Sequence, residues 1–261
     1  MKKVRDIIRE IEALAPIFLK EDFDNVGLMV GDRDKEVKKV LLALDCTLKV
    51  VEEAKRENVD LIITHHPLIF RKPSSITTDT LQGKKIIELI KNDISLYSSH
   101  TNLDSAENGL NSTIVSILGF GNSEILEVNK RDASAGLGRI VKLDNEVFLD
   151  EIINKVKNAL GINNLRVVRG KEKVSKVAII NGSGQDFIGK AVSQGADLII
   201  TGDTTYHFAS DYKEMGINII DVGHFASEQI TFFSVMKNIK DKIKDVEFIT
   251  SNVEEDPYSF A

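Results

Sequence analysis

One pentapeptide, Asp-Leu-Ile-Ile-Thr, occurs twice in this chain, at Asp60–Thr64 and again at Asp197–Thr201. An apolar, strand-like run begins 20 positions before each copy, at Val40 and at Val177, and a helical pattern fills the space between. Two strands and their connecting helix therefore recur without a gap. Unrelated α/β proteins also reuse such strand sequences, but the matched spacing favours a structural repeat.

A third strand-like run follows each copy, and these runs end in histidines, at His100 and His224. Uniformly apolar strands that alternate with helical patterns are typical of parallel sheets covered by helices on both faces. We therefore expect an α/β fold of two similar βαβ-containing lobes, arranged as a layered sheet-and-helix structure. A polar segment near residues 123–136 predicts a first lobe at 1–123 and a second at 124–261. Within the second lobe, residues 124–173 either extend the sheet or act as a connector.

The size and composition of the chain exclude several classes of protein. With 261 residues it can bury a core without cross-links, and its single cysteine, Cys46, cannot form an intramolecular disulfide. The N-terminal segment carries too many charges for a signal peptide, and no apolar run approaches the roughly 20 residues that span a bilayer. A formal net charge of −6 opposes general binding to nucleic acid. We expect a cytoplasmic protein without membrane contact; the overall charge does not indicate nucleic-acid binding, although it leaves room for a local basic patch.

The chain has only five histidines, and each follows a predicted strand or opens a predicted helix. Ligand sites in open α/β sheets gather at the carboxyl ends of the strands, so these side chains are expected to converge there. Carboxylates accompany three of them at a spacing of four residues. The pairs are His100 with Asp104, Asp203 with His207, and His224 with Glu228, and the other two histidines are the neighbours His65 and His66.

Imidazole nitrogens and carboxylate oxygens without thiolate suit zinc, iron, manganese, cobalt or nickel. Neighbouring side chains of a regular strand point to opposite faces, so His65 and His66 cannot easily hold one ion between them. Two ions resolve this, because each histidine can serve one metal while a carboxylate such as Glu228 bridges both. Hydrogen-bonded histidines with a structural role are the alternative. The whole pattern favours a dinuclear metal site between the two lobes.

Three other segments carry weaker signals. The run Asn181–Gly184, with sequence NGSG, can cradle a phosphate with backbone amides or form a tight strand-to-helix turn. Arg71 and Lys72 follow the histidine pair, where they can steer an anionic substrate or be ordinary solvated charges. The segment Asp24–Gly27 is typical of a turn before a short strand.

Seven motifs, DNVGLMVG, ITHHPLIF, HTNLD, GLGR, GSG, ITGDTTYH and GHFASE, follow one another along nearly the whole chain. In this combination the sequence resembles the dinuclear-metal family named for the yeast NGG-one-interacting factor three, whose members are often called GTP cyclohydrolase I type 2 homologs. The resemblance implies that the metal ligands are His65, His66, Asp104, His224 and Glu228. It also implies two divalent metal ions per chain and a ring-shaped homohexamer whose metal sites face an internal cavity.

Two functions follow as hypotheses. The first is a metal-dependent hydrolase acting on a nucleotide-like substrate, in which His207 and Asp203 relay protons. The family name suggests opening of a purine ring, as in GTP cyclohydrolase chemistry, whereas a two-metal site in general suggests phosphoester hydrolysis. The second is a non-catalytic metal-binding assembly, carrier or regulatory protein. An open metal position and a substrate pocket would distinguish the hydrolase, because a structural site is saturated by protein ligands.

Overall fold

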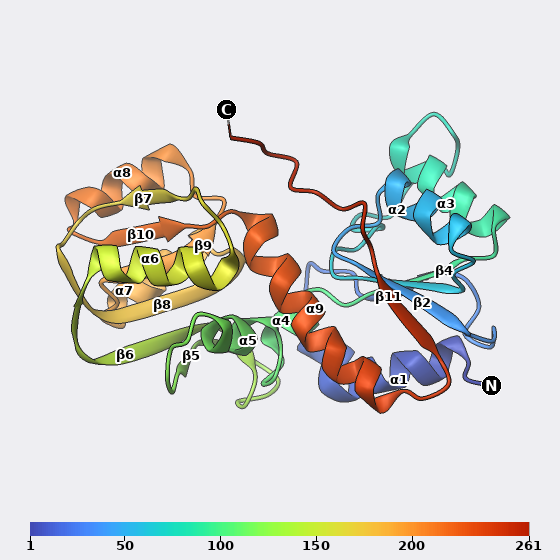
Figure 1. The fold of residues 1–261 in the computed structure, drawn as a ribbon, viewed down its shortest axis with the longest axis horizontal. Coiled ribbons are helices and arrows are strands. Elements are labelled where there is room, and N and C mark those ends of the chain that lie inside the picture. Colours follow the sequence, from blue (N-terminus) through green and yellow to red (C-terminus); the bar gives the residue numbers. More distant parts are fainter. Residues whose placement is uncertain (261) are drawn as a thin grey trace. The chain divides into compact units, whose positions relative to one another are not determined.

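The computed structural model describes residues 1–260, and these form two compact units of mixed α/β structure (Figure 1). Unit 1 comprises residues 1–103 and 232–255, and unit 2 comprises residues 104–231 with the residues from 256 onward. These limits differ from the predicted lobes 1–123 and 124–261. The reason is that one helix within 104–123 packs on the sheet of unit 2, while a strand near the C-terminus joins the sheet of unit 1.

Unit 1 is built on a five-stranded sheet in the order β1-β4-β3-β2-β11. Strands β2, β3, β4 and β11 run parallel, and β1 pairs antiparallel with β4. The strands are β1 (Gly27–Val30), β2 (Lys39–Ala43), β3 (Leu61–Thr64), β4 (Ser95–Ser98) and β11 (Glu247–Thr250). Every residue of β3 and β4 is buried, which explains why these strands lack polar alternation in the sequence.

Helices cover both faces of this sheet, with α2 and α3 on one side and α1 on the other (Figure 1). The core beneath α2 and α3 joins their apolar residues to those of β2, β3 and β4. The N-terminal helix α1 is amphipathic, and its isoleucines at 7, 8 and 11 are buried. The helices are α1 (Val4–Leu14), η1 (Ile17–Leu19), α2 (Leu48–Arg56), α3 (Leu81–Lys91) and the short α4 (Thr101–Ser105), which ends in unit 2.

Unit 2 contains a six-stranded sheet in the order β5-β6-β8-β9-β10-β7. Strands β8, β9 and β10 are parallel, whereas β5, β6 and β7 add antiparallel pairings at the two sides. The strands are β5 (Glu124–Val128), β6 (Gly136–Phe148), β7 (Arg166–Val168), β8 (Lys173–Ser183), β9 (Leu198–Gly202) and β10 (Asn218–Asp221). The segment 124–173 therefore extends this sheet rather than acting as a bare connector.

Two apolar cores lie on the faces of the second sheet, one beneath α5 and α6 and the other beneath α7 and α8. The helices are α5 (Leu110–Ile117), α6 (Leu149–Leu160), η2 (Gln185–Phe187), α7 (Ile188–Ser193), α8 (Tyr206–Glu214) and α9 (His224–Lys242). The limit between the units falls inside α9, because its residues from Phe232 onward are counted with unit 1.

The predicted repeat is visible in the strand register. Val40 lies opposite Leu61 in unit 1, and Val177 lies opposite Leu198 in unit 2. The aspartates that open the two DLIIT segments also have the same hydrogen-bonding role. Each accepts a hydrogen bond from the backbone of the preceding parallel strand. Asp60 accepts from the Lys39 amide at 3.0 Å and Asp197 accepts from the Lys176 amide at 3.1 Å. The two sheets therefore share one β-α-β construction.

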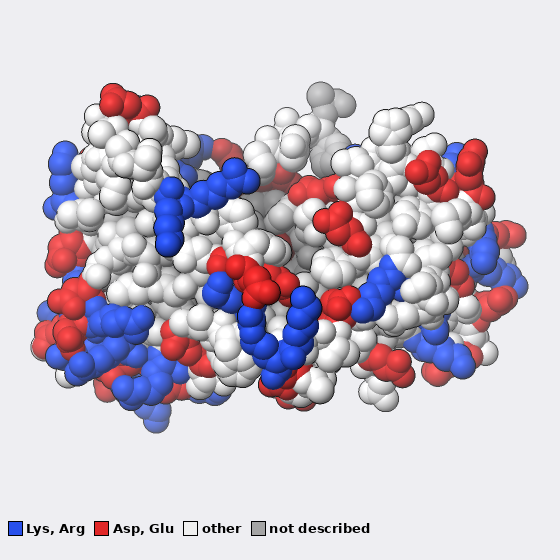
Figure 2. All heavy atoms as spheres, turned by 180° about the vertical axis from the view of Figure 1, so that it is seen from behind, with Lys and Arg blue, Asp and Glu red and all other residues white. Residues whose placement is uncertain are grey.

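The charged side chains and the apolar helices can be examined directly in the structure. On the face seen in Figure 2, basic and acidic side chains are intermixed rather than gathered by sign. No helix within residues 1–260 is both long enough and apolar enough to cross a membrane.

Candidate metal centre

The first group of candidate ligands lies at the carboxyl ends of β3 and β4 in unit 1. Strand β3 ends at Thr64, so His65 and His66 lie just beyond it. Potential donor atoms of His65, His66 and His100 lie within 4.8 Å of one another. The alternation of side chains along a strand therefore does not separate the two neighbours, and this step of the sequence argument was wrong. These three histidines can hold a metal ion.

Each of these imidazoles is oriented through its Nδ1 atom. The Nδ1 of His65, which is fully buried, lies 2.9 Å from the carbonyl oxygen of Ser99. The Nδ1 of His66 lies 3.0 Å from Oδ1 of Asp45. A carbonyl or carboxylate oxygen accepts, so Nδ1 donates, and a neutral ring then carries its lone pair on Nε2. Outer partners of this kind orient the histidine ligands of metal sites.

His100 is oriented in the same way by Asp24, whose Oδ1 lies 2.9 Å from the histidine Nδ1. The other carboxylate oxygen of Asp24 accepts from the backbone amide of Thr101 at 3.1 Å and from its hydroxyl at 2.5 Å. Burial alone would raise the pKa of Asp24, but the bonds from His100 and Thr101 outweigh it and lower the pKa to about 2. Asp24 is therefore a buried carboxylate held in its ionised form beside His100.

The second group lies in unit 2, where α9 begins. The Nδ1 of His224 lies 2.7 Å from Oδ2 of Asp203, and its Nε2 lies 2.8 Å from Oε2 of Glu228. A nitrogen lone pair facing a carboxylate oxygen is repulsive, so this contact needs a positive charge, either a proton on Nε2 or a metal cation. Asp203 follows β9 with a φ of 56°, a conformation that aspartate tolerates better than most residues.

Glycines bring the backbone of unit 2 close to these ligands. A Cβ atom on Gly182, which has a φ of +64°, would lie 1.9 Å from the carboxylate oxygen Oε1 of Glu228. The amides of the GSG segment are also occupied, because Gly182 donates to Ser227 at 3.3 Å and Gly184 donates to Thr201 at 2.9 Å. Residues 181–183 of this segment form the end of β8, and the two glycine amides are not free to bind a phosphate.

Three further residues were predicted at the site, namely Asp104, His207 and Asp203. Asp104 lies in α4, four residues after His100, and its backbone carbonyl accepts a hydrogen bond from Asn111 at 3.1 Å. His207 is exposed on α8 with its ring 5.4 Å from that of Tyr206. Asp203 contacts His224, and within residues 1–260 no described contact joins it to His207.

The sequence-based predictions gave two residues of this site no role. They treated Asp24 as part of a turn and did not consider Asp45, whereas they paired His100 with Asp104 but left His100 out of the ligand set. The position of Asp45 in the sequence could have identified it. It is a carboxylate just after the buried strand β2, and the neighbouring strand β3 leads to His66. The partnership of Asp24 with His100 joins residues 76 positions apart, and no local pattern reveals it.

The lone cysteine is not part of either group. Cys46 is buried beneath α2, and burial raises the pKa of its thiol to about 12. It stays protonated at neutral pH, so it supplies no thiolate for a metal or a nucleophilic reaction. The donor set is therefore nitrogen and oxygen, as the sequence predicts.

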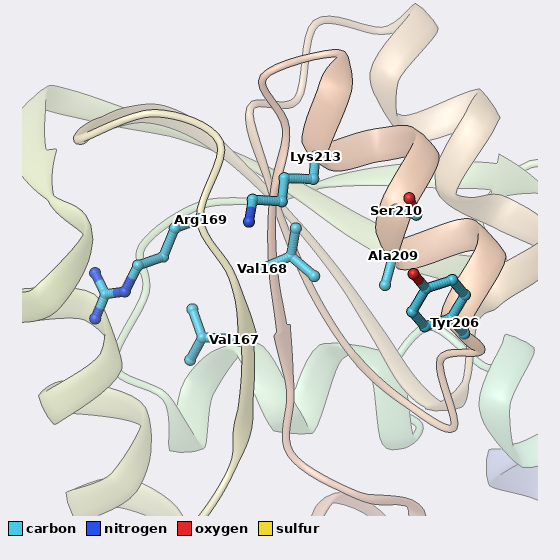
Figure 3. A pocket seen from close by; sticks show the side chains of 7 residues that line it. All are labelled: Val167, Val168, Arg169, Tyr206, Ala209, Ser210 and Lys213. Carbon is cyan, nitrogen blue, oxygen red and sulfur yellow. The ribbon is translucent and has the colours of Figure 1, made fainter.

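A surface hollow of about 420 Å³ lies between β7 and α8 in unit 2 (Figure 3). Its lining contains no histidine or carboxylate, and Arg169 on its border is paired with Asp150 at 2.7 Å. The lining residues are Val167, Val168, Arg169, Tyr206, Ala209, Ser210 and Lys213. This hollow is therefore not a metal site.

Comparison with known proteins gives one consistent result. Residues 2–257 match the family described as Duf34/NIF3 (NGG1p interacting factor 3). A GTP cyclohydrolase 1 type 2 homolog from Clostridium perfringens is 58% identical over 260 residues, which is 99% of each chain. A protein of the same name from Clostridium acetobutylicum is 48% identical over 264 residues, covering 99% of this chain and 98% of its own. The solved structure of a Bacillus cereus protein related to NIF3 aligns with a TM-score of 0.91 and 28% identity, covering 100% of this chain and 99% of its own.

Proposed function

Because this chain belongs to the Duf34/NIF3 (NGG1p interacting factor 3) family, we propose that it is a metal-dependent hydrolase with a dinuclear centre that acts on a nucleotide-like substrate. The proposed ligands are His65, His66, Asp104, His224 and Glu228. They would hold two divalent ions of zinc, iron, manganese, cobalt or nickel. The names of the relatives support a purine nucleotide such as GTP as the substrate.

The observation that carries this proposal is the shared orientation of the histidines. In both groups Nδ1 of the ring is engaged by an accepting oxygen, from Ser99, Asp45, Asp24 or Asp203. A histidine with only a structural role does not need to hydrogen-bond through Nδ1 in particular, since either ring nitrogen can form the bond. With Nδ1 engaged, the three rings of unit 1 carry their lone pair on Nε2, while Nε2 of His224 faces the carboxylate of Glu228 at 2.8 Å, and this arrangement supports metal coordination.

The union of the two groups in one centre rests on the family resemblance, which assigns residues of both groups to a single pair of ions. By that resemblance we propose that Glu228 bridges ions that His65 and His66 also hold.

When bound, the two ions would supply Lewis acidity and lower the pKa of a water molecule toward neutrality. The residues of the chain have separate tasks. Asp45, Asp24 and Asp203 keep their histidines in the correct tautomer and orientation. His100 presents Nε2 beside His65 and His66, where it can accept a proton from water or act as a further ligand.

Proton relay by Asp203 and His207 stays part of the proposal in a modified form. Asp203 contacts His224, so it would act through that ring. His207 is exposed and can exchange protons with solvent. We expect His207→Ala to retain its metal and lose turnover, and retention of full turnover would remove this residue from the mechanism.

The first experiment is metal analysis of the tag-free protein by inductively coupled plasma mass spectrometry, with turnover of GTP and of nucleotide phosphoesters. Two equivalents of metal with chelator-sensitive turnover are expected. Glu228→Ala should lower both equivalents if this residue bridges, whereas two separate sites would lose only one. Absence of metal from the purified protein would refute the proposal.

Two equivalents of metal without turnover would favour the alternative, a metal-binding assembly, carrier or regulatory protein. A homohexamer, implied by the family resemblance, and a cytoplasmic location, expected from the sequence, also belong to the proposal. Light scattering coupled to size-exclusion chromatography measures the first, and cell fractionation measures the second.

A further inference from the structure

Two phenylalanines lie exposed beside the histidine group of unit 1. Phe23 is 69% exposed and Phe70 is 43% exposed, so neither ring contributes fully to the core. Single exposed apolar side chains are common on protein surfaces. These two differ because they contact each other, with ring centroids 6.3 Å apart at 64°, and because Phe70 also contacts His100.

The contact with His100 ties the aromatic pair to the candidate metal centre. The rings of Phe70 and His100 are 6.4 Å apart and nearly perpendicular, at 83°. His100 in turn lies 5.1 Å from His65 and 5.6 Å from His66, measured between ring centroids. A continuous series of rings therefore runs from the ligands to the protein surface.

The backbone on both sides of the pair is fixed. Phe23 directly precedes Asp24, the buried carboxylate that holds His100 and Thr101. Phe70 directly follows Ile69, whose carbonyl accepts a hydrogen bond from the side chain of Asn25 at 2.5 Å. The two segments are thus tied together, and the exposed rings are presented from held positions.

Two cations follow Phe70 directly in the sequence. Arg71 and Lys72 are both exposed, and neither forms an ion pair within residues 1–260. Phe23 is instead directly preceded by the acidic residues Glu21 and Asp22. Exposed aromatic rings next to unpaired cations are the features that bind the base and phosphate of a nucleotide.

We propose that Phe23 and Phe70 bind the planar heteroaromatic ring of the substrate beside the histidine group, while Arg71 and Lys72 bind its phosphate. This inference rests on the proposed function, because it names what selects a nucleotide at that site. Aromatic stacking is tolerant of base identity, so the pair selects for a planar ring rather than for one base. The four residues determine specificity and take no part in the reaction itself.

The test uses the full-length, metal-loaded protein and isothermal titration calorimetry with two probes, guanosine 5′-monophosphate and ribose 5-phosphate. Both probes carry the same 5′-phosphate, and ribose 5-phosphate has a hydroxyl group at C1 in place of guanine. The unchanged protein should bind the nucleotide more tightly. Phe23→Ala and Phe70→Ala should each weaken binding of the nucleotide by about 5- to 100-fold and leave the affinity for ribose 5-phosphate unchanged. Replacing Arg71 and Lys72 together by serine should weaken both probes.

The matched control is Phe148→Ala in unit 2, because Phe148 is 45% exposed and its ring contacts only a lysine among the described aromatic interactions. Metal content is measured for every variant, so loss of the metal centre is distinguished from loss of base binding. Equal affinity of the metal-loaded protein for both probes would overturn the inference. So would unaltered nucleotide affinity in both phenylalanine variants, including the case in which their oligomeric mass changes and the pair proves to be a self-association surface.

Discussion

The carboxylate of Glu254 accepts a hydrogen bond from the backbone amide of Asp45 at 2.8 Å, although 209 residues separate them. The same carboxylate accepts from the amide of Leu44 at 2.7 Å. Asp45 is the residue that orients His66, so a side chain near the C-terminus fixes the segment that positions a candidate ligand. A residue with this role supports the metal centre without touching it.

We predict that Glu254→Ala weakens metal binding by about 10-fold, because loss of an outer partner typically costs a metal site 10- to 100-fold in affinity. Competition titration with a metal-sensitive dye measures this. Glu255→Ala is the control, since Glu255 forms only an exposed ion pair with Lys49. Equal affinity in the two variants would show that Asp45 keeps its position without Glu254.

Gly182→Ala should displace Glu228, because the new Cβ would lie 1.9 Å from the carboxylate oxygen. The substitution also places alanine at a φ of +64°, which by itself costs about 1 kcal/mol. Gly161→Ala separates the two effects, since Gly161 has a φ of +67° and open space around it. We expect both variants to lose similar thermal stability in the presence of chelator, and only Gly182→Ala to lose metal.

Asp24 should make the metal-free protein sensitive to acid. Its pKa is about 2 in the folded chain, below the ordinary value of 3.8, so its stabilising effect is fully present above about pH 5. That contribution, about 2 kcal/mol, is lost as the pH falls from about 5 through 2. Chelator-treated Asp24→Asn should therefore show a shallower decline in the free energy of unfolding over this range, measured by urea denaturation. If the free energy of unfolding fell equally steeply with pH in the unchanged protein and in Asp24→Asn, this account would be contradicted.

Cys46 should be inert in the native protein. Its raised pKa and burial predict no reaction with a thiol reagent at pH 8, and full reaction once denaturant exposes it. Cys46→Ala should retain the same metal content as the unchanged chain. A fall in metal content would show that the thiol takes part in the donor set.

Much of the fold was predictable because the repeat is local. The 20-residue spacing from Val40 to Asp60 and from Val177 to Asp197 corresponds to matched strand pairs in the two sheets. The α/β class and the family are confirmed by the structure and by the comparisons. Strand β11 was not predictable in this way, because it is a short segment whose partner in the sheet, β2, lies about 200 positions earlier.

The candidate site was predictable only in its ligand types. Histidines at strand ends are visible in the sequence, and so is the pairing of His224 with Glu228, since four residues make one helical turn. The convergence of His65 with His66 depends on where β3 ends, which propensity does not fix to a single residue. The contact between Phe70 and His100 likewise depends on a loop conformation that no local sequence pattern determines.

Strand β11 also constrains the order of events during synthesis. Unit 1 begins with residues 1–103, yet its sheet takes its last strand from residues 247–250. A ribosome needs on the order of 10 s to translate the intervening segment, at roughly 5 to 20 residues per second. During that time β2 has an open edge, and the support that Glu254 gives to Asp45 and His66 does not yet exist. The finished histidine group is therefore a property of the completed chain, and the nascent chain presents these imidazoles without their final support.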